Sequence, residues 1–373
     1  MTAGFLPRAD FDTLLAVLRG DGWTVVGPTV RDGAVVLDTV ASASELPIGV
    51  GDVQEAGTYR LRERGDDALF GFNLGPSSWK PWLHPPELPL MRIHRTEEGL
   101  RFEELAVPIP RLAFLGVRSC EVRGIDVLER VVAGGAHADP DAVARRANTL
   151  VIAVHCGQAA ATCFCVSLGT GPRARHGFDL ALGEIGIGAE HGFLVEVGSD
   201  AGRAIAERLP LVPATDGQSA ALEAAVEHAG ASMVRRLDTD GLREDLLAGL
   251  EDPHWRTFDD KCLSCGNCTA VCPTCFCTEV ADTTDLAGAT ATRTRRSDSC
   301  FHLDHSRVHG GAVRGTTHAR YRQWITHKLA TWHDQFGESG CVGCGRCIAW
   351  CPVGIDIVAE AATIRARRAE KSQ

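Results

Sequence analysis

The sequence predicts an α+β protein in which an N-terminal α/β domain precedes an α-helical, cysteine-rich C-terminal domain. Two observations lead to this fold class. Short apolar runs alternate with amphipathic stretches through the first half of the chain, as in an α/β domain. Two dense cysteine runs near the C-terminus enclose a stretch with helical periodicity. We expect the α/β domain over residues 1–198, a helical connector over 199–255 and the C-terminal domain over 256–373.

The N-terminal domain is expected to begin with a helix and to continue through short strands. The helix is "RADFDTLLAVLRG", and the β-prone pieces are "GAVVLDTV", "GTYRLRER" and "ALFGFNL". A strand ending at Cys120, the amphipathic "EVRGIDVLERVVAG" and a strand ending at Cys156 predict a β-α-β unit with parallel strands. Two further strands, "FDLALGEIG" and "GFLVEVG", complete the domain. The connector reads as the helices "AGRAIAERL", "SAALEAAVEHAGASMV" and "GLREDLLAGLE".

Composition restricts what fifteen cysteines in 373 residues can do. The N-terminus lacks a charged and then apolar signal peptide, which predicts a reducing cytoplasm and disfavours disulfides. The sequence has no uninterrupted apolar stretch of the roughly 18 residues that cross a bilayer. A net charge of -10 disfavours a nucleic-acid partner. A metal-binding protein of the cytoplasm, with no nucleic-acid or membrane partner, is the expectation that remains.

The strongest metal signal is a cysteine spacing that occurs twice. "CVGCGRCIAWCP" and "CLSCGNCTAVCP" both follow the C-x2-C-x2-C-x3-C-P pattern of bacterial ferredoxins. Gly266, Gly343 and Gly345 let the backbone approach a cubane and direct amides at its sulfurs. Because the fourth cysteine of each run reaches the other cluster in two-cluster ferredoxins, the pattern predicts two 4Fe-4S clusters with crossed ligands. One would be held by Cys262, Cys265, Cys268 and Cys351, and the other by Cys341, Cys344, Cys347 and Cys272. A pair of zinc knuckles is the alternative, although it would not require the fourth Cys-Pro of each run.

Between the two runs, "ARYRQWITHKLATWHDQFG" predicts a helix with Trp324, Ile325, Leu329 and Trp332 on its apolar face. This long insertion is typical of a helical ferredoxin domain. The stretch also carries many basic residues, which form either a solvated helix face or a basic collar that offsets anionic clusters or docks an acidic partner. They are Arg293, Arg295, Arg296, Arg307, Arg314, Arg320, Arg322 and Lys328. His302, His305 and His309 are interpreted as surface or outer-shell histidines.

A third metal site is predicted at the β-α-β unit. Cys120 and Cys156 lie just beyond the carboxyl ends of two parallel strands, the edge at which open α/β sheets bind ligands. Cys120 also lies at a helix N-terminus, which favours a thiolate or an anionic cluster. Cys163 and Cys165, in "ATCFCVS", follow Cys156 by a short loop and can fold back to the same edge. Four thiols at one site predict a third 4Fe-4S cluster, and small buried thiols of the core are the alternative. "SLGTGP" lacks the spacing of a phosphate-binding loop, so we expect no nucleotide there.

The second "TCFC", at residues 274–277, leaves Cys275, Cys277 and Cys300 without an assigned role. These thiols could line a cluster edge, replace an assumed ligand or form a separate site. We favour the first interpretation.

The chain resembles the beta subunit of sulfhydrogenase-type nickel-iron hydrogenases and the related A subunit of anaerobic sulfite reductase. The resemblance is carried by "GFNLGPSSWKPWLHPP", "GVRSCEVRGIDVLERV", "TCFCVSLGTGP", "CLSCGNCTAVCPTCFC", "RYRQWITHKL" and "CVGCGRCIAWCPVGIDI". It implies an electron-transfer subunit of a hetero-oligomer, placed between a flavin subunit that uses NAD(P) and the small and large subunits of a hydrogenase. An anaerobic sulfite reductase is the alternative complex.

The residues themselves favour an electron relay that has no catalytic residues of its own. No G-x-G-x-x-G follows a predicted strand, so we expect this chain to bind neither flavin nor nicotinamide. A self-contained iron-sulfur enzyme is the second class of function. It would require that only three cysteines of the third site bind iron, which would leave one iron open to a substrate.

Overall fold

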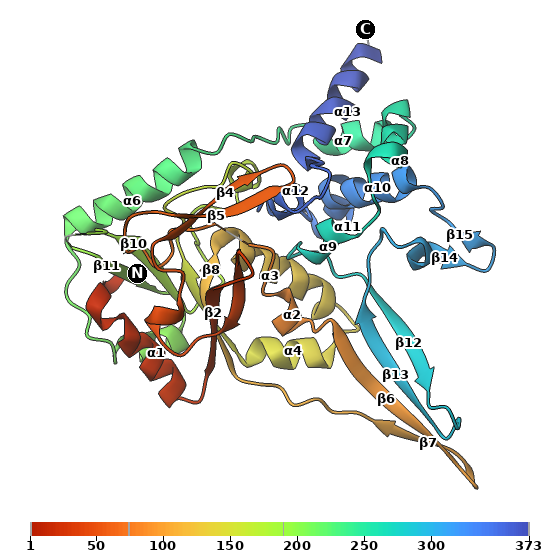
Figure 1. Ribbon diagram of the computed structural model, residues 1–373, viewed down its shortest axis with the longest axis horizontal. Coiled ribbons are helices and arrows are strands. Elements are labelled where there is room, and N and C mark those ends of the chain that lie inside the picture. Colours follow the sequence, from red (N-terminus) through yellow and green to blue (C-terminus); the bar gives the residue numbers. More distant parts are fainter. Residues whose placement is uncertain (1, 74, 189, 372–373) are drawn as a thin grey trace.

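The computed structural model describes residues 2–73, 75–188 and 190–371, and it is a mixed α/β structure with several sheets (Figure 1). The largest sheet has seven strands in the order β1-β11-β10-β9-β8-β2-β3. Its centre is parallel, because β9 pairs in parallel with both β8 and β10, and β8 pairs in parallel with β2. The strands are β1 (Thr2–Pro7), β2 (Thr24–Arg31), β3 (Ala34–Thr39), β8 (Leu112–Arg118), β9 (Thr149–Val154), β10 (Leu180–Ile185) and β11 (Gly192–Val197).

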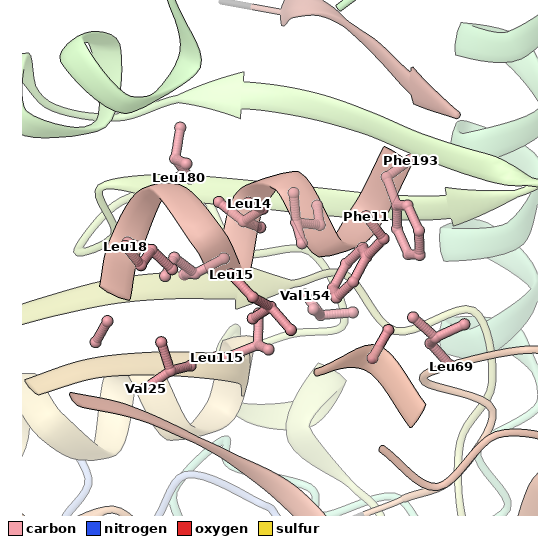
Figure 2. Packing of buried hydrophobic residues seen from close by; sticks show 14 of the residues in the cluster. Phe11, Leu14, Leu15, Leu18, Val25, Leu69, Leu115, Val154, Leu180 and Phe193 are labelled. Carbon is pink, nitrogen blue, oxygen red and sulfur yellow. The ribbon is translucent and has the colours of Figure 1, made fainter. Parts of the chain in front are cut away.

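The predicted β-α-β unit is confirmed as β8, α3 and β9, with an additional helix, α4, before β9. All residues of β8 and β9 are buried, as expected of parallel strands that are covered on both faces. One face packs against α1, whose buried Phe11, Leu14 and Leu18 lie over the sheet (Figure 2). The other face packs against α3. The helices around this sheet are α1 (Phe11–Gly20), α2 (Lys80–Leu83), α3 (Ser119–Val132), α4 (Pro140–Ala147), α5 (Asp200–Ala206) and α6 (Asp216–Ala231).

The expected strand "ALFGFNL" does not form in its described residues, 68–73, and Leu74 lies outside the described residues. The backbone amides of Leu69 and Phe70 instead donate to the carboxylate of Glu184, at 2.6 and 2.9 Å. Because a side chain satisfies these amides, the segment needs no strand partner. Phe70 and Phe72 enter the core beneath α1.

A four-stranded antiparallel sheet projects from the body of the molecule (Figure 1). It joins strands from distant parts of the chain in the order β12-β13-β6-β7. The bounds are β6 (Glu87–Thr96), β7 (Gly99–Glu104), β12 (Thr278–Thr284) and β13 (Thr290–Ser297). The expectation of a solvated helix face is wrong for Arg293, Arg295 and Arg296, which lie on β13. Their segment, "TATRTRR", alternates β-branched threonine with other residues at the period of a strand.

The C-terminal part is largely helical, and its core is aromatic. Tyr321 stacks on Phe258 with ring centroids 3.7 Å apart. The predicted helix is confirmed, since Trp324, Ile325, Leu329 and Trp332 are buried on α10, a π-helical turn (His327–Thr331) and α11. The helices are α7 (Leu242–Ala248), α8 (Phe258–Lys261), α9 (Asn267–Ala270), α10 (Thr317–Thr326), α11 (Trp332–Phe336), α12 (Arg346–Ala349) and α13 (Ile357–Lys371).

Short elements complete the structure. Two hairpins are formed by β4 (Val50–Glu55) with β5 (Thr58–Glu63) and by β14 (Arg307–Val308) with β15 (Gly311–Ala312). The first hairpin lies against the end of the second cysteine run, where Tyr59 packs on Trp350 with centroids 5.1 Å apart. Single 3-10 turns occupy Arg8–Asp10, Ala43–Glu45, Cys165–Leu168, Pro253–Thr257 and Leu303–Ser306. Among the described residues, no helix is both long and apolar enough to cross a membrane.

Candidate iron-sulfur centres

The structure brings one predicted group of cysteines to the wall of a single apolar cavity. This first thiol set consists of Cys262, Cys265, Cys268 and Cys351. Phe301, Tyr321 and Trp324 line the same cavity. Cys351 comes from the second cysteine run, and its nearness raises the pKa of Cys262 together with burial, which is the larger cause. Cys347, which belongs to the other predicted group, also reaches this cavity, so five thiols line it. The four thiols of the first set fit a cluster that takes one thiolate on each iron.

The second thiol set, defined as Cys272, Cys341, Cys344 and Cys347, is also assembled from both runs. Burial raises the pKa of Cys347, and the neighbouring sulfurs of Cys341, Cys344 and Cys272 raise it further. Cys272 therefore lies among the cysteines of the other run, as the crossed pattern predicts. Whether these thiols bind iron remains a prediction.

The third thiol set consists of Cys120, Cys156, Cys163 and Cys165. Cys120 is the second residue of α3, Cys156 lies two residues beyond β9, and Cys163 and Cys165 fold back in the following loop. Burial raises the pKa of Cys165, and the sulfurs of Cys156 and Cys163 raise it further. A side chain at Gly171 would place its Cβ 2.9 Å from the Cys165 sulfur, so glycine keeps space free beside this thiol.

The second set has electrostatic neighbours in both of the other sets. Cys344 is an electrostatic neighbour of Cys120, Cys163 and Cys165. On the other side, Cys347 and Cys272 are neighbours of Cys268 in the first set. Such an order gives a continuous path from the edge of the large sheet to the aromatic core of the C-terminal part.

The two cysteine runs share a backbone conformation that follows from their spacing. The amides of Ser264 and Gly343 donate to the sulfurs of Cys262 and Cys341, each at 3.4 Å. Both runs are left-handed at this position and again two residues later, with φ of 51° at Ser264 and 71° at Gly266, and of 65° at Gly343 and 75° at Gly345. Amides that point at sulfur stabilise the thiolate form that a metal requires.

The first "TCFC" loop packs directly on the second cysteine run. This contact, which the cysteine spacing does not predict, brings Cys163 and Cys165 close to that run. The amide of Phe164 donates to the carbonyl of Gly343 at 2.9 Å. Added Cβ atoms would lie 2.6 Å from the Cys165 Cα at Gly343 and 2.3 Å from the Thr162 carbonyl oxygen at Gly345. The glycines of this run therefore admit the loop that carries Cys163 and Cys165.

We expect Gly345→Ala to displace this loop and to lower the iron content of the protein. The added methyl meets backbone atoms that cannot rotate away, in addition to the cost of a left-handed alanine, on the order of 1 kcal/mol. Gly288→Ala is the matched control, because Gly288 has a φ of 64° and open space around its Cβ position. Iron analysis and thermal unfolding should show a larger loss for Gly345→Ala. Equal losses of iron and of thermal stability in the two variants would mean that the close approach of the loop to Gly345 does not affect cluster binding.

Each thiol set has a buried cation beside it. Arg118 lies by Cys156, Arg320 by Cys262, and Lys328 by Cys272 and Cys341. All three are less than 8% exposed. No carboxylate of the described residues forms an ion pair with them, and they bond to carbonyl or hydroxyl oxygens instead. Buried charges need a counter-charge, and an anionic cluster with its thiolates would supply one.

Lys328, one of the basic residues between the two cysteine runs, is buried beside the second thiol set. Its amine is buried within the π-helical turn and donates to Thr274 of the second "TCFC" at 2.9 Å. Burial disfavours its charge, yet the sulfurs of Cys272, Cys275 and Cys341 outweigh burial and hold the pKa of Lys328 well above its usual range. Arg320 and Lys328 thus match the expected offset of anionic clusters, whereas Arg293 and Arg307 are exposed and paired with Asp282 and Asp304.

Lys328→Met should lower the reduction potential of the cluster expected at the second thiol set. Removing a positive charge a few ångströms away disfavours the added electron by on the order of 100 mV, for an effective dielectric constant of about 20. Lys261→Met is the control, because that amine is 44% exposed and pairs with Glu360. Redox titration followed by electron paramagnetic resonance distinguishes the two variants. An unchanged potential in Lys328→Met would contradict this role.

A buried ion pair links the second and third sets. Arg346 follows Cys344 and lies 2.5 Å from Glu121, which follows Cys120, and both side chains are 2% exposed. Glu121 also accepts from the Trp79 indole at 3.0 Å. The arginine bonds further to the carbonyls of Gly75 and Ser77. Sequence reasoning missed Arg118, Glu121 and Arg346, although Glu121 and Arg346 each lie within two residues of a predicted ligand.

The three unassigned cysteines separate into two places. Cys275 shares a hydrogen bond with Cys272, whereas Cys277 shares one with Cys300. His302 and His305 pair with Asp298 rather than with a thiol set, and His309 is exposed, in agreement with their interpretation as outer histidines. Across the described residues, no group of three or more histidines, cysteines or acids is placed to hold one metal ion.

Comparison with known proteins identifies the family. Residues 261–355 match the 4Fe-4S dicluster domain family. The chain is 35% identical over 251 residues to the sulfhydrogenase 2 subunit beta of Pyrococcus furiosus, a match that covers 66% of this chain and 72% of that protein. The chain belongs to the sulfhydrogenase beta subunit family. The dicluster domain confirms that the C-terminal part of this family member is of the 4Fe-4S type. No solved structure matches the chain.

Proposed function

We propose that the chain is an electron-transfer subunit that relays single electrons through three 4Fe-4S clusters, one at each thiol set. The position of the second set, which has neighbours in both of the other sets, is the observation that carries the proposal. When bound, such clusters supply one-electron oxidation and reduction, with potentials set by charge, hydrogen bonds and burial. An electron could enter at either end and leave at the other.

The chain's own residues would hold and tune these clusters. Twelve cysteines would serve as ligands, with Cys272 and Cys351 exchanged between the two runs. The amides of Ser264 and Gly343 would donate to ligand sulfurs. Arg118, Arg320 and Lys328 would offset the negative charge, and Phe301, Tyr321 and Trp324 would shield the buried side of the first set from water.

The complex itself is part of the proposal. The relative is named as a subunit of a sulfhydrogenase, which supports a hetero-oligomeric hydrogenase complex. We propose that this complex is cytoplasmic. We infer that a flavin subunit exchanges electrons with NAD(P) at one end of the relay and that hydrogenase subunits use them at the other. This chain would bind no flavin or nucleotide and would have no catalytic residue.

The experiment compares the isolated chain with the complex. Purified anaerobically, the chain should accept electrons from a low-potential dye yet show no hydrogen uptake, sulfite reduction or NAD(P)H oxidation. Added to a complex that lacks it, the chain should restore electron flow from NAD(P)H without changing the partner's own dye-linked activity. Restoration of sulfite reduction alone would assign the chain to the alternative complex. Steady NAD(P)H oxidation by the isolated chain would make it an enzyme and overturn the proposal.

A further inference from the structure

The second "TCFC" places a thiol pair at the base of the projecting β12–β13 hairpin. Thr278 opens β12 and pairs with Ser297, the last residue of β13. Just below this pair, the amide of Asp298 donates to the carbonyl of Cys277 at 2.8 Å. Cys300 follows two residues later, and its thiol and amide hydrogen bond to the Cys277 sulfur. Neither cysteine belongs to a thiol set.

A surface cavity gives access to this pair. Its lining includes Cys277, Cys275 and Cys265, the last of which belongs to the first thiol set and is exposed. Cys300 is not part of this lining, and its electrostatic neighbours include Cys277 and Cys268 of the first set. The cavity therefore joins solvent, a thiol pair and the edge of the first thiol set.

Charge around the cavity favours an anionic ligand. Lys80 lies on the wall, and its amine bonds only to the carbonyls of Thr269 and Ala270, at 3.2 and 3.4 Å, with no carboxylate partner among the described residues. Asp298, the acid on the wall, is already paired with His302 and His305. The amine of Lys80 is thus free to attract a negative group.

The pKa values of the two thiols differ, as those of an attacking and a resolving thiol do. Hydrogen bonding from Cys300, together with the nearby His305, lowers the pKa of Cys277 to about 6 against the opposing effect of burial. The same hydrogen bond raises the pKa of Cys300. Thiolate character and access determine which cysteine attacks, and both favour Cys277.

We propose that Cys277 and Cys300 form a redox-active dithiol that exchanges with small anionic disulfides through this cavity. The Cys277 thiolate attacks one sulfur of the disulfide, forms a mixed disulfide and releases the first ligand thiolate. Cys300 loses its proton and attacks the Cys277 sulfur, which forms the Cys277–Cys300 disulfide and releases the second thiolate. Two electrons, delivered singly from the adjoining cluster, and two protons restore the dithiol. Only this last step rests on the proposed relay.

Exchange can be tested on the anaerobic, iron-loaded chain with oxidised glutathione, an anionic disulfide, and with uncharged 2-hydroxyethyl disulfide. Peptide mapping after alkylation should find the Cys277–Cys300 disulfide, formed faster with oxidised glutathione. Lys80→Met should remove that preference. Cys300→Ser should stop at a glutathione adduct on Cys277, whereas Cys275→Ser, the control in the same cavity, should still form the disulfide. Absence of the disulfide at unchanged iron content would overturn the inference and leave the relay intact.

The re-reduction step has its own readout. A reductive titration of the oxidised chain should take up two more electrons than the same titration of Cys277→Ser, because the disulfide is a two-electron couple and that variant lacks the attacking thiol. Equal uptake, with the disulfide still present at the end, would show that the clusters do not feed the pair and would overturn this part of the inference.

Discussion

Cys120→Ser should remove one whole cluster and leave the other two intact. With three four-iron clusters, the reconstituted wild-type chain should carry about 12 iron and 12 sulfide, and the variant about 8 of each. The reason is geometric, because Cys120 is buried at the start of α3 and has Cys156, Cys165 and Cys344 as neighbours.

The spectra of the reduced protein should agree with the iron and sulfide content. One paramagnetic species of the reduced protein should disappear from Cys120→Ser, and the signals of the dicluster domain should stay. Cys275→Ser is the matched control, since it removes a thiol outside all three sets. A wild-type value that stays near 8 iron would rule out the third cluster and make Cys120 a core thiol.

Cys351→Ala should damage the cluster bound by Cys262, Cys265 and Cys268. The cluster bound by the other cysteines of its own run, Cys341, Cys344 and Cys347, should stay. Cys351 lines the same cavity as those three thiols. Because cluster binding is coupled to folding, the loss should also destabilise the aromatic core formed by Phe258, Tyr321 and Trp324.

The reciprocal variant is the control for this prediction. Cys272→Ala should affect the cluster of the second thiol set and shift the species that responds to Lys328→Met. Resonance Raman and paramagnetic resonance spectra of the two variants should therefore differ. If each variant lost the cluster of its own run, the crossed ligation would be wrong.

Local sequence signals explain how much of the fold was predictable. The strands of the β-α-β unit and the helix that carries Trp324 and Leu329 have strong periodicity, and both are present. The projecting sheet was not foreseen as a unit, because β6 and β13 pair across some 200 residues of sequence. A strand pairing at that separation leaves no local signal.

The site shows the same division between local and long-range features. Cysteine spacing was sufficient to propose the first two sets, and the strand ends of the predicted β-α-β unit led to the third. The crossed pattern followed from the proline after each fourth cysteine. The nearness of the third set to the second depends on the approach of the first "TCFC" loop to Gly343 and Gly345, which no spacing reveals. The burial of the cations could not be predicted for a similar reason. Arg320 and Lys328 lie in a basic stretch that is typical of a solvated helix face, and only tertiary packing buries them.

The most direct test of the relay is the position of iron in the anaerobically prepared chain. Anomalous diffraction at the iron absorption edge locates each cluster without reference to activity. The proposal predicts three separate peaks, at the Cys120 set, the Cys341 set and the Cys262 set, with the Cys341 set between the other two. Two peaks only, or a peak bound by Cys262, Cys265, Cys268 and Cys272 together, would contradict it.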